Sequence, residues 1–286
     1  MSRCRCCMYY RTVTDDVTGR RTTDGAGVRL VRVLGDPTVA RFDPFLMLDA
    51  FDSRDPQDYI RGFPLHPHRG IETFTYLAAG RIDHKDSLGN AGSIRDGGCQ
   101  WMTAGSGILH EEMPRASERM LGLQLWVNLP AKDKMAAPGY QSSTKADIPV
   151  VTLPDDGGTL RVIAGRYDTV TGPAHTFSPL NVWDFALNQG RHLTLAQPEG
   201  WSTALVVLEG SITVNGTAQA GEAQLVVLSQ EGDKLHLEAN SDAKVLLMAG
   251  EPLNEPIVGY GPFVMNSKAE INEAIRDFNS GRFGQL

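Results

Sequence analysis

Short runs of β-branched and large apolar residues, separated by glycine and proline, follow one another along most of this chain. The clearest runs are Val28–Val33, Thr73–Leu77, Leu123–Val127, Ala204–Leu208, Gln224–Leu228 and Lys244–Met248. Runs of about five to eight residues at close spacing are typical of the strands of a β-sandwich or β-barrel. Long amphipathic helical patterns are nearly absent, so we predict an all-β protein with turns supplied by 30 glycines and 16 prolines.

The end of the chain carries one exception to this β pattern. Ser267 followed by Glu270 is a capping-box pattern. Apolar residues then recur at helical spacing, and they are Ile271, Ala274, Ile275 and Phe278. Gly281 supplies a stop, so we expect one short helix that packs on the barrel through this apolar stripe.

The 286 residues are enough for two domains or for one large all-β unit. Tyr76–Ile82 and Val207–Thr213 resemble each other, because both have the order strand, glycine turn, strand. An apolar run followed by glycine is common, so chance similarity is the alternative. We predict tandem barrels, with an N-terminal domain over residues 1–136, a linker over 137–147 and a C-terminal domain over 148–286.

Composition limits the binding partners and the cellular compartment that we expect for this chain. The formal net charge of −7 predicts no basic surface for nucleic acid. No apolar stretch approaches the roughly 18 residues of a membrane span. With 4 cysteines and no signal-peptide pattern, the chain fits a reducing, cytoplasmic compartment better than secretion. Cys4, Cys6 and Cys7 could bind a soft metal, but their place at a terminus favours no structural or catalytic role.

Two polar pairs with strand spacing stand out against this background. His66 and His68 are two residues apart, and so are His110 and Glu112, with Glu111 directed to the other side. Residues i and i+2 of a strand share a face. If the two strands are neighbours that face inward, three imidazoles and one carboxylate surround one point. Such a set is a mononuclear metal site with open coordination positions.

Either pair alone would be weak support for a metal, because single pairs of this kind are commonly chance or surface features. Together they are more specific, since both lie in glycine-punctuated β segments. In the second half, the offsets of His66 and His68 from Gly80 lead to Ala196 and Pro198 when counted back from Gly210. Neither residue can bind a metal. His236 and Glu238 do form a pair with strand spacing in this half, but they lack partners, so we expect them to face solvent, with a relic metal site as the alternative.

Longer motifs resemble one known family. His66–Thr73 (HPHRGIET) and Asp96–Pro114 (DGGCQWMTAGSGILHEEMP) resemble the signature of the pirins, a family of the cupin superfamily. Asp43–Asp49 (DPFLMLD) and Leu123–Pro130 (LQLWVNLP) match as well, and the likeness runs from about Thr23 to the final helix. The resemblance implies a bicupin fold of two tandem, jelly-roll-like barrels with a metal in the N-terminal barrel.

The resemblance maps the metal ligands onto His66, His68, His110 and Glu112, the four residues that the strand spacing selects. In many other cupins the carboxylate ligand lies at the position of Glu72. Here Glu72 begins the strand that continues to Leu77, so we keep it as a supporting or structural residue. The resemblance favours iron, while manganese, cobalt, nickel, copper and zinc suit the same ligand types.

The resemblance implies a dioxygenase that opens flavonol-type substrates such as quercetin, or related enols and catechols, with O₂. The substrate enolate would chelate the metal, and Glu112 would act as general base. Gln124 and Asn128 are candidates to support the site. Four apolar residues are candidate walls, with plain core packing as the alternative: Phe45, Phe74, Trp101 and Met102.

A second hypothesis belongs to another class of function. Some pirins act as metal-dependent and redox-dependent binding proteins that modulate transcription factors or metabolic enzymes. Without a basic patch, such an effect here would require a protein partner. A different small-molecule reaction at the same metal is a third reading, because a fold does not decide the chemistry.

Overall fold

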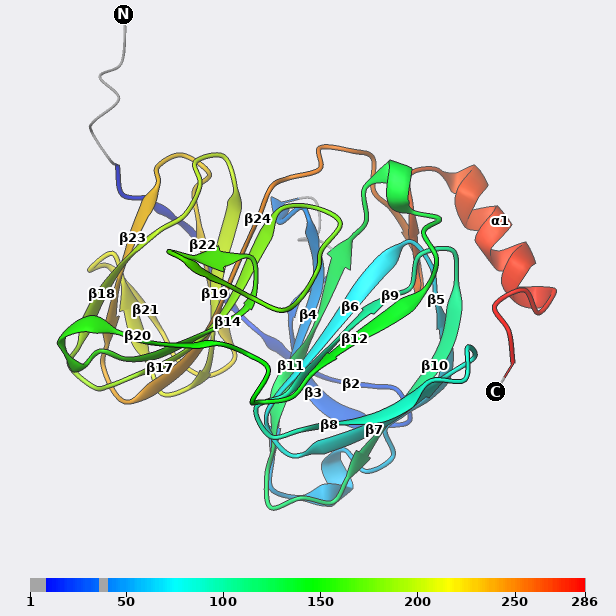
Figure 1. Ribbon diagram of the computed structural model, residues 1–286, viewed down its shortest axis with the longest axis horizontal. Helices are drawn as coiled ribbons and strands as arrows, with labels where there is room; N and C mark the ends of the chain where they lie inside the picture. Colours follow the sequence, from blue (N-terminus) through cyan, green and yellow to red (C-terminus); the bar gives the residue numbers. More distant parts are fainter. Residues whose placement is uncertain (1–8, 36–40, 286) are drawn as a thin grey trace, which may run out of the picture. The chain divides into compact units, whose positions relative to one another are not determined.

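The computed structural model describes residues 9–35 and 41–285 (Figure 1). Cys4, Cys6 and Cys7 lie outside these residues, so the hypothesis of a soft-metal site there stays open. The chain divides into two compact units. The first barrel comprises residues 20–147 and 253–286, and the second comprises residues up to Gly19 together with Ile148–Pro252.

The first barrel contains two antiparallel sheets. The larger one has the order β12 (Gly139–Ser143), β9 (Cys99–Thr103), β6 (Ile71–Ala79), β11 (Met120–Asn128), β4 (Phe45–Ser53), β3 (Val28–Leu34) and β2 (Arg20–Asp24). The smaller one has the order β5 (Phe63–His68), β10 (Ile108–Arg115), β7 (Arg81–Asp86) and β8 (Ala91–Arg95). Side chains of β6 and β11 contact side chains of β10 and β5, so the inner faces of the two sheets meet.

The second barrel repeats this arrangement. Its larger sheet has the order β1 (Val13–Thr18), β22 (Gln224–Leu228), β19 (Ser202–Glu209), β24 (Ala243–Gly250), β17 (Leu180–Leu187), β14 (Gly158–Ala164) and β13 (Val150–Thr152). Its smaller sheet has the order β18 (His192–Ala196), β23 (Lys234–Ala239), β20 (Ile212–Val214) and β21 (Ala218–Ala220). The internal repeat is therefore confirmed, with Gly80 and Gly210 in corresponding turns.

Short elements complete the chain. They are β15 (Arg166–Tyr167), β16 (Val170–Thr171), β25 (Val258–Tyr260), β26 (Phe263–Met265) and the 3-10 turns Pro56–Asp58, Ala131–Asp133 and Pro154–Asp156. All six apolar runs that the sequence predicts as strands lie inside strands. Among the described residues, no helix combines the length and the apolar character needed to cross a membrane.

The boundaries of the units differ from the expected domains at both ends of the chain. β1, near the N-terminus, pairs with β22 of the second barrel. The segment expected as a linker, 137–147, contains β12, which pairs with β9 of the first barrel. The C-terminal segment from Leu253 belongs to the first barrel. These exchanges depend on long-range strand pairing, which local sequence patterns do not report.

The helix α1 (Lys268–Asn279) follows the expected pattern closely. The Ser267 hydroxyl accepts a hydrogen bond from the Glu270 amide at 3.3 Å, which is the N-cap half of the predicted capping box, and Glu270 Oε2 accepts from the Ser267 hydroxyl at 2.7 Å and from the Asn266 amide at 3.2 Å. Ile271 and Ala274 are buried in a cluster with β26, and Phe278 is more exposed than the spacing predicts. The helix thus covers part of the first barrel, beside β5 (Figure 1).

Candidate metal centre

The two histidine-bearing strands are direct neighbours. β5 and β10 pair in antiparallel register, with His110 opposite His66 and Ile108 opposite His68. The three imidazole rings lie 4.3–5.1 Å apart, centre to centre. Each ring offers one nitrogen, and these nitrogens all lie within 4.8 Å of one another. The predicted convergence of His66, His68 and His110 is therefore observed.

Each of these imidazoles keeps one ring nitrogen available for a metal. His66 Nδ1 donates to the Pro64 carbonyl oxygen at 2.8 Å, which leaves Nε2. His110 Nδ1 lies 3.5 Å from the Tyr140 hydroxyl, and its buried Nε2 has no hydrogen-bond partner. The buried Nδ1 of His68 also has none. Unsatisfied buried nitrogens are rare in native proteins, and a metal ion would satisfy the one on His110.

Burial also sets the protonation state of the two inner histidines. Burial, with the nearby His66 as a second cause, lowers the pKa of His68 to about 3. Burial likewise lowers the pKa of His110, and the neighbouring imidazoles act in the same direction. Because a metal binds the neutral imidazole, these residues carry the form that ligates at neutral pH.

Glu112 lies on the same inner face and is 2 % exposed. Its Oε1 accepts a hydrogen bond from the Thr75 hydroxyl at 3.0 Å, and its Oε2 accepts one from Gln124 Nε2 at 2.7 Å. Glu112 is not among the three residues whose ligand atoms converge. Each carboxylate oxygen has a second lone pair, so both hydrogen bonds are compatible with metal binding. Glu112 as the fourth metal ligand therefore stays a prediction. The side chain of Gln124 does hold the Glu112 carboxylate, through the hydrogen bond to Oε2.

Glu111 alternates to the outer side of β10, as expected. Its carboxylate lies 3.3 Å from the Lys85 ammonium. The β-bulge between His110 and Glu112 shifts the pairing with β5, so that Glu112 lies opposite Phe63. The outer side of β10, on which Glu111 lies, takes no part in the candidate site.

Three further residues on the inner faces of the sheets were not predicted as site residues from the sequence, and they are His84, Tyr140 and Trp126. His84 on β7 lies opposite Glu112. Its Nε2 is 2.7 Å from Gln100 Nε2, and its ring stacks on Tyr140 at 5.4 Å. The alternation of Ile82, His84 and Asp86 after the glycine turn is the signal that could have identified His84. Tyr140 gave no such signal, because it lies in the segment expected as a linker.

Trp126 belongs to the motif Leu123–Pro130 (LQLWVNLP), but it was not predicted to lie at the site. Its ring lies 5.1 Å from that of His68, edge to face. It is two residues beyond Gln124 on β11, and therefore on the same inner face. Met102 packs in an apolar cluster with Trp126 and Tyr140, and its role as a wall of the site stays a prediction.

The remaining wall candidates are core residues on the other face of the larger sheet. Phe74 is the neighbour of Thr75 on β6, and its ring packs in a tilted arrangement against Trp101, 5.1 Å between ring centres. Phe45 lies opposite Val127, the neighbour of Trp126. Since adjacent strand residues face opposite sides, all three point away from the histidines.

Glu72 and Asn128 also act elsewhere. Glu72 lies on the face of β6 opposite to Thr75 and accepts a hydrogen bond from the Thr103 hydroxyl at 2.9 Å. Burial raises the pKa of Glu72 to about 7. Asn128 Oδ1 accepts from the buried Lys134 ammonium at 2.6 Å. Both residues are structural rather than part of the candidate site.

The second barrel offers hydrocarbon at the corresponding place. β18 and β23 take the positions of β5 and β10, and their inner side chains are the buried residues Leu193, Leu195, Leu235 and Leu237. His236 and Glu238 alternate to the other face, where His236 Nδ1 lies 3.3 Å from the Thr194 hydroxyl. The expectation that this pair faces away from the barrel interior is confirmed. Over residues 9–35 and 41–285, the first-barrel triad is the one group of converging metal-ligating side chains.

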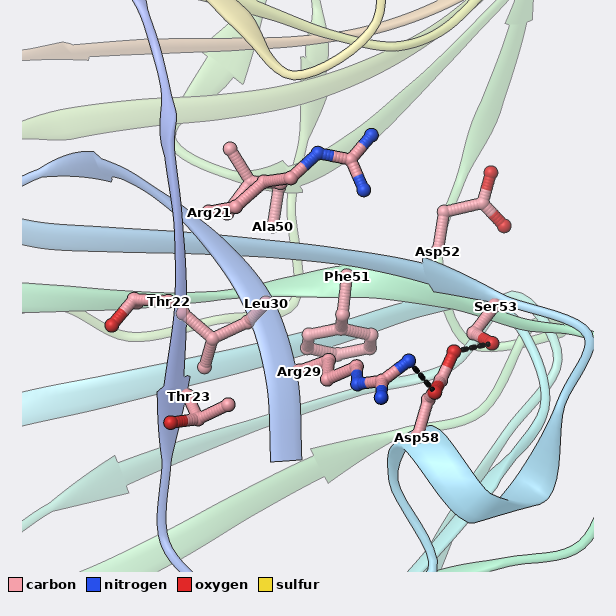
Figure 2. Close-up of a pocket in the computed structure, with 11 residues that line it drawn as sticks. Arg21, Thr22, Thr23, Arg29, Leu30, Ala50, Phe51, Asp52, Ser53 and Asp58 are labelled. Carbon is pink, nitrogen blue, oxygen red and sulfur yellow. Dashed lines mark hydrogen bonds and ion pairs between the residues drawn. The ribbon is translucent and has the colours of Figure 1, made fainter. Parts of the chain in front are cut away.

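The first barrel also carries an open groove of about 450 Å³ over β2, β3 and β4 (Figure 2). Val31 and Ala50 in its wall lie opposite each other, next to the inward pair Arg32 and Asp49. The groove is lined by residues from both faces of these strands, among them the adjacent Leu30 and Val31, and none of the three histidines lines it. The one lining ion pair, between Arg29 and Asp58 at 2.8 Å, joins opposite charges.

Comparison with known proteins adds three findings to this geometry. The profile of the family described as Pirin matches residues 27–127, and the profile described as Pirin C-terminal cupin domain matches residues 182–284. A Pseudomonas aeruginosa protein named "Putative quercetin 2,3-dioxygenase" is 48 % identical over 283 residues, covering 95 % of this chain and 98 % of that protein. The similarity thus extends over both barrels.

Solved structures agree with these matches. The crystal structure of a quercetin 2,3-dioxygenase from Acinetobacter baumannii has a TM-score of 0.92 and 44 % identity, covering 97 % of this chain and 99 % of that chain. A bacterial pirin from Escherichia coli, in complex with nickel(II), has a TM-score of 0.65 and 21 % identity, covering 86 % of this chain and 100 % of that chain. The second similarity concerns the fold alone.

Proposed function

This chain belongs to the pirin family, and we propose that it is a metal-dependent dioxygenase that opens flavonol-type substrates with O₂. The observation that carries the proposal is the convergence of three imidazole nitrogens at one point inside the first barrel. The names of the relatives from P. aeruginosa and A. baumannii support quercetin 2,3-dioxygenase chemistry.

In this proposal His66, His68 and His110 hold one divalent transition metal, and Glu112 completes the set. Three neutral imidazoles with one carboxylate suit iron, which we favour, and also manganese, cobalt, nickel, copper or zinc. When bound, the metal supplies Lewis acidity toward an enol oxygen and redox chemistry with O₂.

The proton chemistry falls to Glu112. Its carboxylate accepts hydrogen bonds from Thr75 and Gln124. This buried carboxylate beside the histidines is placed to accept the proton of a substrate hydroxyl at one of its oxygens. The two donors would then keep the side chain oriented toward the substrate.

The apolar and aromatic side chains would orient the substrate and exclude water. The Trp126 ring lies against the His68 ring, and Met102 belongs to the apolar cluster on which Trp126 and Tyr140 pack. The Tyr140 hydroxyl lies near His110. Flat side chains of this kind suit the planar rings of a flavonol. Gln100 and His84 supply polar groups on the same inner side.

The experiment follows loss of flavonol absorbance and consumption of O₂ by protein loaded with Fe(II) under chelator-free conditions. We expect turnover by the wild type, its loss in His66→Ala, and retention in the matched control Glu111→Ala, which removes an outward carboxylate. We expect Glu112→Gln to bind metal and lose most turnover. Metal-loaded protein that leaves flavonols, catechols and related enols unchanged would refute the proposal, and a stoichiometric protein partner would then favour the binding function.

A further inference from the structure

The turn that follows His68 is held by the far end of the chain. The Arg69 amide donates to the Pro262 carbonyl oxygen at 3.4 Å, and the Val264 amide donates to the Arg69 carbonyl oxygen at 3.1 Å. Gly70 has a φ of +78°, and a Cβ there would lie 2.0 Å from the Val264 carbonyl oxygen. The backbone next to a proposed ligand is thus packed directly on β26.

The side chain of Arg69 strengthens this connection. It is buried, its Nε donates to the Ser106 carbonyl oxygen at 2.7 Å, and a terminal nitrogen donates to Asp277 Oδ2 on α1 at 2.9 Å. The guanidinium also lies 4.7 Å from the centre of the Phe283 ring. Asp277 Oδ1 accepts a second hydrogen bond, from Arg282 at 2.5 Å. Breaking a buried ion pair leaves an uncompensated charge, so this pairing strongly constrains Arg69.

The same segment reaches the strand that carries His110. The Ser87 hydroxyl accepts from the Leu109 amide at 3.1 Å and donates to the Phe283 carbonyl oxygen at 2.6 Å. A Cβ on Gly107 would lie 2.6 Å from the Phe283 ring. Leu109 packs in the same apolar cluster as Phe283. Each of the two buried histidines therefore has a neighbouring residue fixed by the C-terminal segment.

We propose that the C-terminal segment from Pro262 to Gly284 positions the metal ligands, with Asp277 and Phe283 as positioning residues that act through Arg69 and Leu109. The inference rests on the proposed metal centre and extends it. The contacts are made on the outer side of β5 and β10, so the segment orients the ligands and does not touch the metal. Loss of outer partners of metal ligands typically costs roughly 10- to 100-fold in metal affinity.

The test compares Asp277→Asn with Glu273→Gln, a matched control on the exposed side of the same helix. The measurements are the dissociation constant of Co(II), by competition with a chelator, and the visible absorption spectrum of the Co(II) protein. We expect Asp277→Asn to weaken Co(II) binding roughly tenfold and to change the spectrum, because the ligand geometry is altered. The control is expected to match the wild type in both measurements.

Metal-free melting temperature separates positioning from plain stability. If Asp277→Asn lowers this temperature but leaves the Co(II) affinity and spectrum unchanged, the segment is merely structural and the inference is wrong. Should Asp277→Asn fail to fold, Phe283→Leu provides the same comparison with a smaller change. Co(II) binding by the wild type that is lost in His66→Ala establishes the metal centre itself. Absence of that binding would refute the proposed function, and the inference with it.

Discussion

Replacing Glu72 with glutamine is expected to make the stability of the protein less dependent on pH. Glu72 is 1 % exposed, and its carboxylate is supported by neutral groups, the hydroxyl of Thr103 and the indole of Trp101. Burial is the main cause that raises the pKa of Glu72 from 4.5 to about 7, and the Thr103 hydrogen bond opposes it. The folded protein therefore binds this proton more tightly than the unfolded chain does.

The sign follows from this difference in proton binding. Below the unfolded pKa of 4.5 both states are protonated, and Glu72 costs nothing. As the pH rises toward the folded value of about 7, the unfolded chain loses the proton first, so the free energy of unfolding falls. At 1.36 kcal/mol for each pKa unit, the full loss above that pH is about 3 kcal/mol.

The assay is urea unfolding of the wild type and of Glu72→Gln, in the presence of a chelator, near pH 4.5 and near pH 8. Glutamine keeps an oxygen for Thr103 but cannot ionise. We expect similar unfolding free energies at the lower pH, and a variant more stable by up to about 3 kcal/mol at the higher pH. The control Glu273→Gln, at an exposed position, is expected to show no pH-dependent difference. A stability difference for Glu72→Gln that is equal at both pH values would refute the reasoning.

Three further predictions follow from single contacts. Lys134→Met leaves three oxygens, of Gly70, Asn128 and Val264, without a buried donor, so urea unfolding is expected to show a loss of about 3 kcal/mol; an unchanged midpoint would contradict this. Tyr140→Phe is expected to weaken Co(II) binding roughly tenfold in a chelator competition, and equal affinity would show that its hydroxyl does not support the nearby histidine. Leu237→Ala is expected to lower the unfolding free energy by about 2–5 kcal/mol without changing metal content, and loss of metal would contradict the separate role of the second barrel.

Much of the β architecture could be predicted because a buried strand has a recognisable local sequence pattern. The strand β6 is predicted from its dense β-branched and aromatic run, and most of its residues are buried. β12 was missed because its sequence, GYQSS, has no apolar alternation and only partial burial. It forms through pairing with β9, which is a long-range contact. The exchange of β1 and the C-terminal helix between the expected domains has the same origin.

The candidate site was predictable to the extent that it depends on the two-residue period of strands. That period selected His66, His68, His110 and Glu112 and placed the three histidines correctly on one face. The same period places His84 on one face with Ile82 and Asp86, but it could not tell that His84 lies opposite Glu112, because β7 and β10 are far apart in the sequence. Nor could local patterns tell that the far end of the chain packs on the turn after His68.

The central claim, that the first barrel holds a metal and the second does not, is tested most directly by anomalous diffraction. A crystal of the protein loaded with Fe(II) or Co(II) would be measured on both sides of the metal absorption edge. We predict one anomalous peak per chain, about 2.0–2.2 Å from nitrogens of His66, His68 and His110. No peak at these nitrogens in fully loaded protein, or a peak held by residues of the second barrel, would contradict the account.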